Sequence, residues 1–83
     1  MTTINVTIES YGMIKTTLPS ALNIVCAHGS DVDSILQRIA RDHVASVPLL
    51  EQCACAIADD MVSRQTKLYA DSTLVLLSPV AGG

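Results

Sequence analysis

The feature that most constrains the fold is an amphipathic pattern between residues 31 and 43. Apolar side chains recur there at the i, i+3, i+4, i+7 and i+8 positions, while polar and charged side chains occupy the opposite face. Ser30 is suited to cap such a helix, and Asp31 and Asp33 would favour its positive N-terminal end. We therefore predict a helix over residues 31–43 that packs on a sheet through Val32, Ile35, Leu36, Ile39 and Ala40.

Strand patterns lie on both sides of this helix. Residues 3–10 alternate strictly, with Ile4, Val6 and Ile8 on one face, which predicts a half-buried strand. Residues 13–20 indicate a loose connection, and residues 44–52 show no clear pattern around Pro48, which forbids a long regular element. Further strands are expected at residues 21–27, 53–58, 61–63 and 73–77, with Asp59 and Asp60 forming a turn.

The order of these elements predicts an α+β fold in which a mixed sheet of about five strands packs on one main helix. The first two strands would pair as a hairpin, the helix would cross over, and the last strand would lie centrally beside the first. This arrangement is the β-grasp, ubiquitin-like architecture. We predict one domain over residues 1–77, followed by a flexible tail over residues 78–83.

Composition and charge exclude several functional classes. The net charge is -3, the five basic residues are dispersed, and aromatic residues make up only 2 % of the chain, so we expect no nucleic-acid surface. No apolar run is long enough to span a membrane, and the N-terminus lacks the features of a secretory signal. Three cysteines, an odd number, fit a reducing compartment, and we expect a cytoplasmic protein.

The body of the chain offers no catalytic constellation. Cys53 and Cys55 would share one face of a strand, but together with Cys26 they are one thiolate short of an iron–sulfur site, and none shows zinc-finger spacing. His28 and His43 lie far apart in the sequence. We therefore predict no metal site and no bound cofactor, and interpret the cysteines as packing residues.

The terminal carboxylate is the one group of the chain that is suited to a chemical reaction. Ser78-Pro79 follows the last apolar strand, and the chain then closes on small or branched residues and Gly82-Gly83. Two glycines without Cβ atoms could enter a passage too narrow for side chains. Residues 80–83 would reach about 13 Å when extended, far enough to place the terminal carboxylate in another protein's active site.

This ending, together with the Gly29-Ser30-Asp31-Val32 helix entry and the apolar strand before Asp59-Asp60, resembles the MoaD/ThiS family of sulfur carriers. Within that family the chain is most similar to the small subunit of molybdopterin synthase. It departs from the family's pattern in the last strand and before the tail, where aromatic residues and a double proline are common and Leu76, Leu77 and Ser78 stand here.

The resemblance implies a carrier that is not catalytic on its own. An adenylating enzyme of the ubiquitin-activating type, using ATP, would join AMP to the carboxylate of Gly83, and a sulfur donor protein would convert it to a thiocarboxylate. Gly82 and Ala81 would let the tail thread into the large subunit of molybdopterin synthase, where the sulfur is used for molybdenum cofactor biosynthesis. The implied apolar docking face comprises Leu76, Leu77, Pro79 and Val80.

Two alternatives remain open at this point. The same tail would serve a carrier for thiamine thiazole or another sulfur pathway. It would also serve a ubiquitin-like modifier or binding module, in which the terminal carboxylate forms an isopeptide bond with a lysine.

Overall fold

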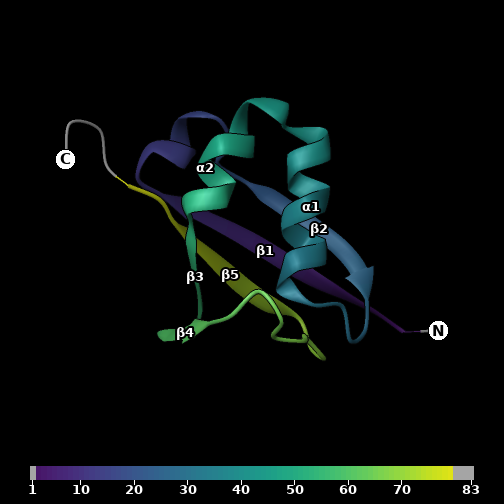
Figure 1. Cartoon of the computed structure of the whole chain (residues 1–83). Helices are drawn as coiled ribbons and strands as arrows, with labels where there is room; N and C mark the ends of the chain where they lie inside the picture. The colour runs from purple at the N-terminus through teal and green to yellow at the C-terminus, as the bar shows by residue number, and fades with distance from the viewer. Residues whose placement is uncertain (1, 80–83) are drawn as a thin grey trace.

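The computed structural model describes residues 2–79. They form a five-stranded sheet in the order β2-β1-β5-β3-β4, with the helices on one of its faces (Figure 1). The strands are β1 (Thr3–Tyr11), β2 (Leu22–Ala27), β3 (Ala54–Ile57), β4 (Asp60–Val62) and β5 (Ser72–Leu77). The helices are α1 (Val32–Asp42) and α2 (Val47–Gln52), with short 3-10 helices η1 (Met13–Thr16) and η2 (Val44–Ser46).

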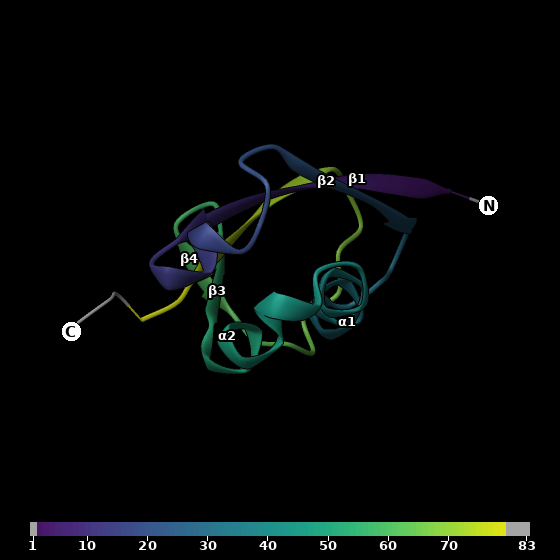
Figure 2. The same ribbon diagram turned by 90° about the horizontal axis from the view of Figure 1, so that it is seen from above.

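The pairing of the strands confirms the mixed sheet. β1 is antiparallel to β2 and parallel to β5, from Val6 opposite Ser72 to Tyr11 opposite Leu77. β3 is antiparallel to both β5 and β4. The last strand therefore lies centrally beside the first, and the sheet curves around α1 when the molecule is seen from above (Figure 2). The predicted ubiquitin-like β-grasp architecture is confirmed.

The main helix lies where its periodicity predicts, but its cap is one residue later than expected. Asp31 is the N-cap, and its Oδ1 accepts a hydrogen bond of 2.8 Å from the Ser34 backbone N–H. Ser30 instead donates its hydroxyl to the carbonyl of Ala27 at 2.7 Å. The prediction of Ser30 as the cap was wrong because both residue types can cap a helix, and the local turn decides which one faces the free N–H groups.

Two segments without a clear sequence pattern are more regular than expected. Residues 44–52 form η2 and α2, and Pro48 falls in the first turn of α2, where its missing N–H costs nothing. Residues 13–16, predicted as a loose connection, form η1, whose Ile14 is fully buried. Buried Ser46 is bonded to Thr17 through their hydroxyls at 2.7 Å, which ties these two segments together.

The β3–β4 hairpin turns through Ala58 and Asp59, one residue earlier than predicted. Both have positive φ angles, 49° and 70°, and Ile57 lies opposite Asp60 in the register. A two-residue loop with both residues left-handed is a type I′ turn, which matches the twist of the flanking strands. β4 is a short edge strand, as expected, and begins at Asp60.

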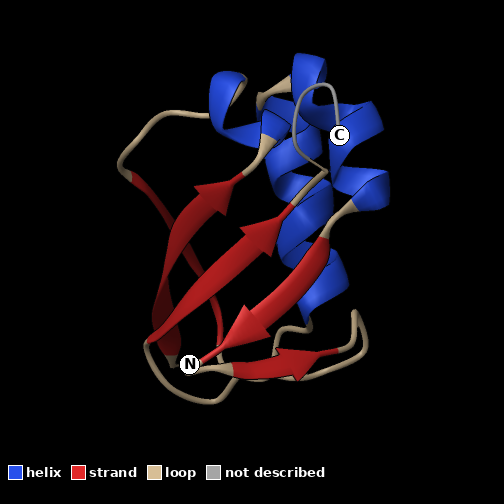
Figure 3. Ribbon diagram, turned by 90° about the vertical axis from the view of Figure 1, so that its left-hand side faces the viewer, coloured by secondary structure: helices blue, strands red, loops and turns tan. Residues whose placement is uncertain are grey.

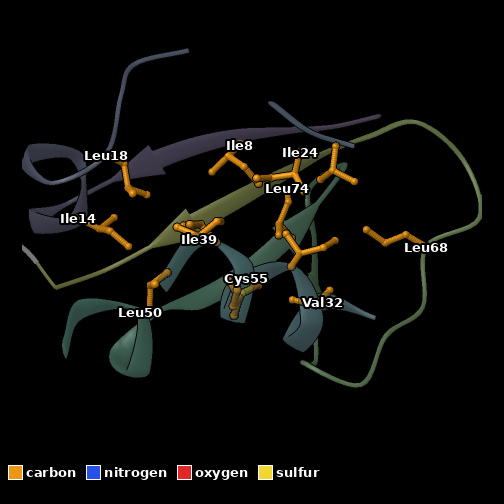
Figure 4. Close-up of a cluster of buried hydrophobic side chains, with 14 of the residues drawn as sticks. Ile8, Ile14, Leu18, Ile24, Val32, Ile39, Leu50, Cys55, Leu68 and Leu74 are labelled. Atoms are coloured by element: carbon orange, nitrogen blue, oxygen red, sulfur yellow. The ribbon is translucent and has the colours of Figure 1, made fainter. Parts of the chain in front are cut away.

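A single apolar core lies between the sheet and the helices (Figure 4). The alternation of β1 holds, since Ile4, Val6 and Ile8 are all buried. Figure 4 shows that the side chains meeting there come from the sheet, from α1 and α2, from η1 and from the loop before β5. Within residues 2–79, no helix is long and apolar enough to cross a membrane. The largest fully buried hydrophobic side chains are Val6, Ile14, Val32, Ile35, Ile39, Leu74 and Leu76.

Candidate functional site: the root of the C-terminal tail

The chain remains bonded to the body beyond the end of β5. Ser78 donates its backbone N–H to the carbonyl of Tyr11 at 3.0 Å, and the Met13 N–H donates to the carbonyl of Pro79 at 2.9 Å. These bonds continue the pairing of β1 with β5 past Leu77. The boundary predicted between residues 77 and 78 is therefore corrected, because Ser78 and Pro79 are bonded to the domain.

The hydroxyl of Ser78 adds a side-chain bridge at the same place. Ser78 Oγ accepts a hydrogen bond of 2.8 Å from the Ile14 N–H and donates one of 3.0 Å to the Tyr11 carbonyl. Both partners belong to the corner where β1 runs into η1. The serine thus joins the end of the last strand to a segment more than sixty residues earlier in the chain.

Gly12 lies at the centre of this corner and has a backbone conformation that other residues rarely adopt. Its φ is 83° and its ψ is -156°, a region that is essentially restricted to glycine. A Cβ atom built on it would lie 2.1 Å from the Ser78 carbonyl oxygen. Gly12 therefore allows the two backbones to approach closely. We call residues 11–14 together with Ser78 and Pro79 the tail-root site.

The predicted site residues divide into three groups. Leu76 is 0 % exposed and belongs to the core, so its side chain is not available to a partner, contrary to the sequence-based expectation. Leu77 is 37 % exposed on the opposite face of the sheet, and Pro79 is exposed beside it. Val80, Ala81, Gly82 and Gly83 lie outside the described residues. The prediction for Leu76 was wrong because an unbroken apolar run does not show which of its residues face the helices.

The face of the sheet opposite the helices has an apolar area near the tail root, and Figure 3 looks onto this face. In the sheet register, Leu77 of β5 lies between Tyr11 of β1 and Ala54 of β3. Val75 of β5 lies opposite Ala56 of β3, and Ala56 in turn lies opposite Met61 of β4. Residues directly opposite in neighbouring strands share a face. Tyr11 is 51 % and Met61 is 63 % exposed. We call Tyr11, Ala54, Met61, Val75 and Leu77 the outer-face patch.

Sequence reasoning missed Tyr11 and Met61 as surface residues of this patch. The alternation of β1 carried the signal for Tyr11, since continuing the pattern of Thr7 and Glu9 by two residues places Tyr11 on the outer face. Met61 had no such signal, because its face depends on the register of a three-residue strand.

Cys53 and Cys55 are not activated nucleophiles. Burial raises the pKa of the Cys53 thiol to about 11, and the neighbouring Cys55 adds to this shift. Burial also raises the pKa of Cys55, although Arg64 opposes it. Both side chains pack against or within the core, so they share a face as predicted and are protonated at neutral pH. Cys26 is half-buried at the edge of the core.

Neither histidine lies in a cluster that could hold a metal ion. Within residues 2–79 no group of three or more histidine, cysteine, aspartate or glutamate side chains is arranged for this. The ring of His28 instead packs edge-on against Tyr69, with the two centroids 5.0 Å apart.

The sheet order and the crossing helix define a ubiquitin-like β-grasp domain. Among solved structures that share it is a putative molybdopterin converting factor subunit 1 from Pyrococcus furiosus, with 15 % identity, a TM-score of 0.79 and coverage of 93 % of this chain and 99 % of that one. Small archaeal modifier protein 1 from Haloferax volcanii has 12 % identity and a TM-score of 0.79 over 93 % of this chain and 99 % of that one.

A third similar structure is a complex of subunits 1 and 2 of the molybdopterin-converting factor from Helicobacter pylori. The matching chain has 26 % identity, a TM-score of 0.62, and coverage of 96 % of this chain and 100 % of that one. No protein-family model and no curated protein sequence matches the chain. These three neighbours are of the molybdopterin-converting-factor and small-modifier types, and the resemblance to the MoaD/ThiS sulfur carriers is confirmed at the level of the fold.

Proposed function

We propose that this protein is a sulfur carrier in which the carboxylate of Gly83 is adenylated and then converted to a thiocarboxylate. The observation that carries the proposal is the tail-root site, which bonds Ser78 and Pro79 to the body two residues before the Gly-Gly ending. The similarity in fold to subunit 1 of molybdopterin-converting factors supports the same function.

The chemistry of a carboxylate explains why such a carrier needs a partner. At neutral pH the α-carboxyl is ionised, and its negative charge resists attack by nucleophiles. In the proposed cycle its oxygen attacks the α-phosphorus of ATP, pyrophosphate leaves, and an acyl adenylate forms. A sulfide equivalent from the sulfur donor protein then attacks the acyl carbon, and AMP leaves. The adenylating enzyme and the sulfur donor supply the catalytic groups.

Cys53 and Cys55 are poorly suited to carry the sulfur themselves. Persulfide formation on a cysteine requires a reactive thiolate. Cys53 and Cys55 are held in the protonated state by burial, which raises the pKa of each. The proposal assigns the sulfur to the C-terminus of the chain and not to these two thiols.

The proposed docking surface for the large synthase subunit is the outer-face patch together with Pro79. It is apolar, it lies next to the tail root, and it includes Tyr11 and Leu77 opposite each other in the register. The H. pylori structure, in which a similar chain forms a complex with subunit 2, supports a partner of this type. We propose molybdopterin as the product of the pathway and the cytoplasm as the compartment where ATP and the partners are found.

The proposal is tested by intact-mass spectrometry. The protein is incubated with ATP, an adenylating enzyme of the ubiquitin-activating type and a sulfur source, and one oxygen-to-sulfur exchange at the C-terminus is expected. A Gly83 deletion variant is the matched control and should fold normally but gain no sulfur. An unmodified wild-type chain with every such enzyme would contradict the proposal. Lysine conjugates without a thiocarboxylate would indicate a protein modifier instead.

A further inference from the structure

We propose that Ser78 is a positioning residue that fixes the point from which the tail extends to the active site of the adenylating enzyme. The inference rests on the proposed function and adds a residue that acts through the tail and not on the reacting atoms. It is carried by hydrogen bonds of Ser78 and by the close contact of Ser78 with Gly12.

The first step of the argument is that Ser78 and Pro79 cap η1 from the other end of the chain. The first N–H groups of a helix have no partner within it and need an external acceptor. The N-cap residue of η1 is Gly12, which has no side chain to supply one. The Pro79 carbonyl accepts from Met13 N–H, and Ser78 Oγ accepts from Ile14 N–H at 2.8 Å. The start of η1 therefore depends on the tail root.

The second step concerns the carbonyl of Tyr11, the last residue of β1. It accepts the backbone N–H and the hydroxyl of Ser78, each at 3.0 Å. The Ser78 hydroxyl accepts from the Ile14 N–H and donates to the Tyr11 carbonyl. Because it acts as acceptor and donor at once, it is held in one orientation. Ser78 is partly exposed, and its bond from the Ile14 N–H is partly buried.

The third step is that Gly12 leaves Ser78 almost no freedom to shift toward the corner. A Cβ at position 12 would lie 2.1 Å from the carbonyl oxygen of Ser78 and 2.8 Å from its Oγ. The bonds and this contact together determine where Pro79 leaves the sheet. The segment beyond that fixed point is residues 80–83, with a reach of about 13 Å at ~3.3 Å per residue.

Release of Ser78 would free residues 78 and 79, which would then have to be ordered again when the carboxylate reaches the active site. Each residue that has to be ordered lowers the fraction of docked complexes in which the carboxylate is correctly placed. We expect a loss of about tenfold in kcat for adenylation, equivalent to about 1.4 kcal/mol. KM should change little, because Ser78→Ala removes a single hydroxyl and leaves the exposed side chains of the domain unaltered.

The variants are Ser78→Ala, which removes the hydroxyl, and Ser78→Thr, which retains it. Ser72→Ala is the matched control, because Ser72 also donates its hydroxyl to a backbone carbonyl, that of Ala70 at 2.8 Å, but at the opposite end of β5. Amide hydrogen exchange reports on the tail root directly. In Ser78→Ala the Ile14 amide should exchange at least about tenfold faster, while the core amide of Leu74 is unchanged, because local opening is independent of global unfolding.

Adenylation is measured by ATP–pyrophosphate exchange with the adenylating enzyme that accepts the wild-type chain. The expected result is a lower kcat for Ser78→Ala, recovery in Ser78→Thr and no effect in Ser72→Ala. A purely structural role would raise the apparent KM through a larger unfolded fraction and leave kcat unchanged, and that result would overturn the inference. Unchanged exchange of the Ile14 amide would overturn it as well. If no such enzyme adenylates the wild-type chain, the proposed function itself is contradicted. Failure of the proposed function is thereby distinguished from failure of the role assigned to Ser78.

Discussion

Replacement of Gly12 by alanine is the most direct test of how the tail root is built. The added Cβ would lie 2.1 Å from the Ser78 carbonyl oxygen, a backbone atom that cannot rotate away. In addition, alanine would have to adopt a φ of 83°. The variant therefore combines backbone strain with displacement of the last two described residues of the chain.

The two effects can be separated in magnitude. A side chain forced into such a conformation costs about 1–3 kcal/mol. Displacement of Ser78 breaks hydrogen bonds to Tyr11 and Ile14, each worth about 0.5–1.5 kcal/mol, and some of them are replaced by water. We expect the free energy of unfolding to fall by about 3–5 kcal/mol in total, and the value is to be measured by urea denaturation with a two-state fit.

Gly29→Ala provides the matched control. Gly29 also has a positive φ, 88°, but a Cβ there meets only the Tyr69 ring edge at 3.6 Å, an ordinary contact. Gly29→Ala should lower the free energy of unfolding only by the cost of holding a side chain at a positive φ, about 1–2 kcal/mol. The difference of about 2 kcal/mol between the variants measures the close approach of Gly12 to Ser78. Equal destabilisation within about 0.5 kcal/mol would refute the role assigned to this contact.

Three further changes test other parts of the structure. Leu77→Asp should abolish binding of the large subunit in calorimetry while the free energy of unfolding changes by less than about 1 kcal/mol, and unchanged binding would exclude the outer-face patch as the docking surface. Arg38 donates to the Val25 carbonyl at the edge strand β2, so Arg38→Ala should expose this edge and cause concentration-dependent dimerisation in size-exclusion chromatography; a monomer at all concentrations would contradict this. The hydrogen bonds from the Ser34 side chain and backbone lower the pKa of Asp31 below its ordinary value of 3.8, so this carboxylate stabilises the fold above that pH. That stabilisation should be lost as pH falls through the lowered pKa, and the stability difference between wild type and Asp31→Asn should shrink there instead of staying constant.

The periodic elements of the fold could be predicted from sequence because each depends on local spacing. The alternation of Ile4, Val6 and Ile8 defines β1, and the helical spacing from Val32 to Ile39 defines α1. Their order then limits the topology to few arrangements, since short connections and a crossing helix favour one sheet.

The features that failed depend on contacts between distant residues. Ser78 was predicted as the start of a free tail because its partners, Tyr11 and Ile14, are more than sixty residues away. Ile14 was assigned to a loose connection, although it is fully buried, because a short 3-10 helix has too few residues for a pattern. Leu76 and Leu77 are both apolar, and only the alternation of β5 within the folded sheet decides which one is buried.

The parallel pairing of β1 with β5 has a consequence for the order of events during synthesis. These two strands are the first and the last within residues 2–79, and β5 separates β1 from β3 within the sheet. Contacts of such high sequence separation form late, because the whole intervening chain must be available first. The sheet cannot close until β5 has been synthesised, so Pro79 reaches its bonded position only after β5 has paired with β1. A chain that is truncated before β5, or misfolded, would therefore lack the tail-root site.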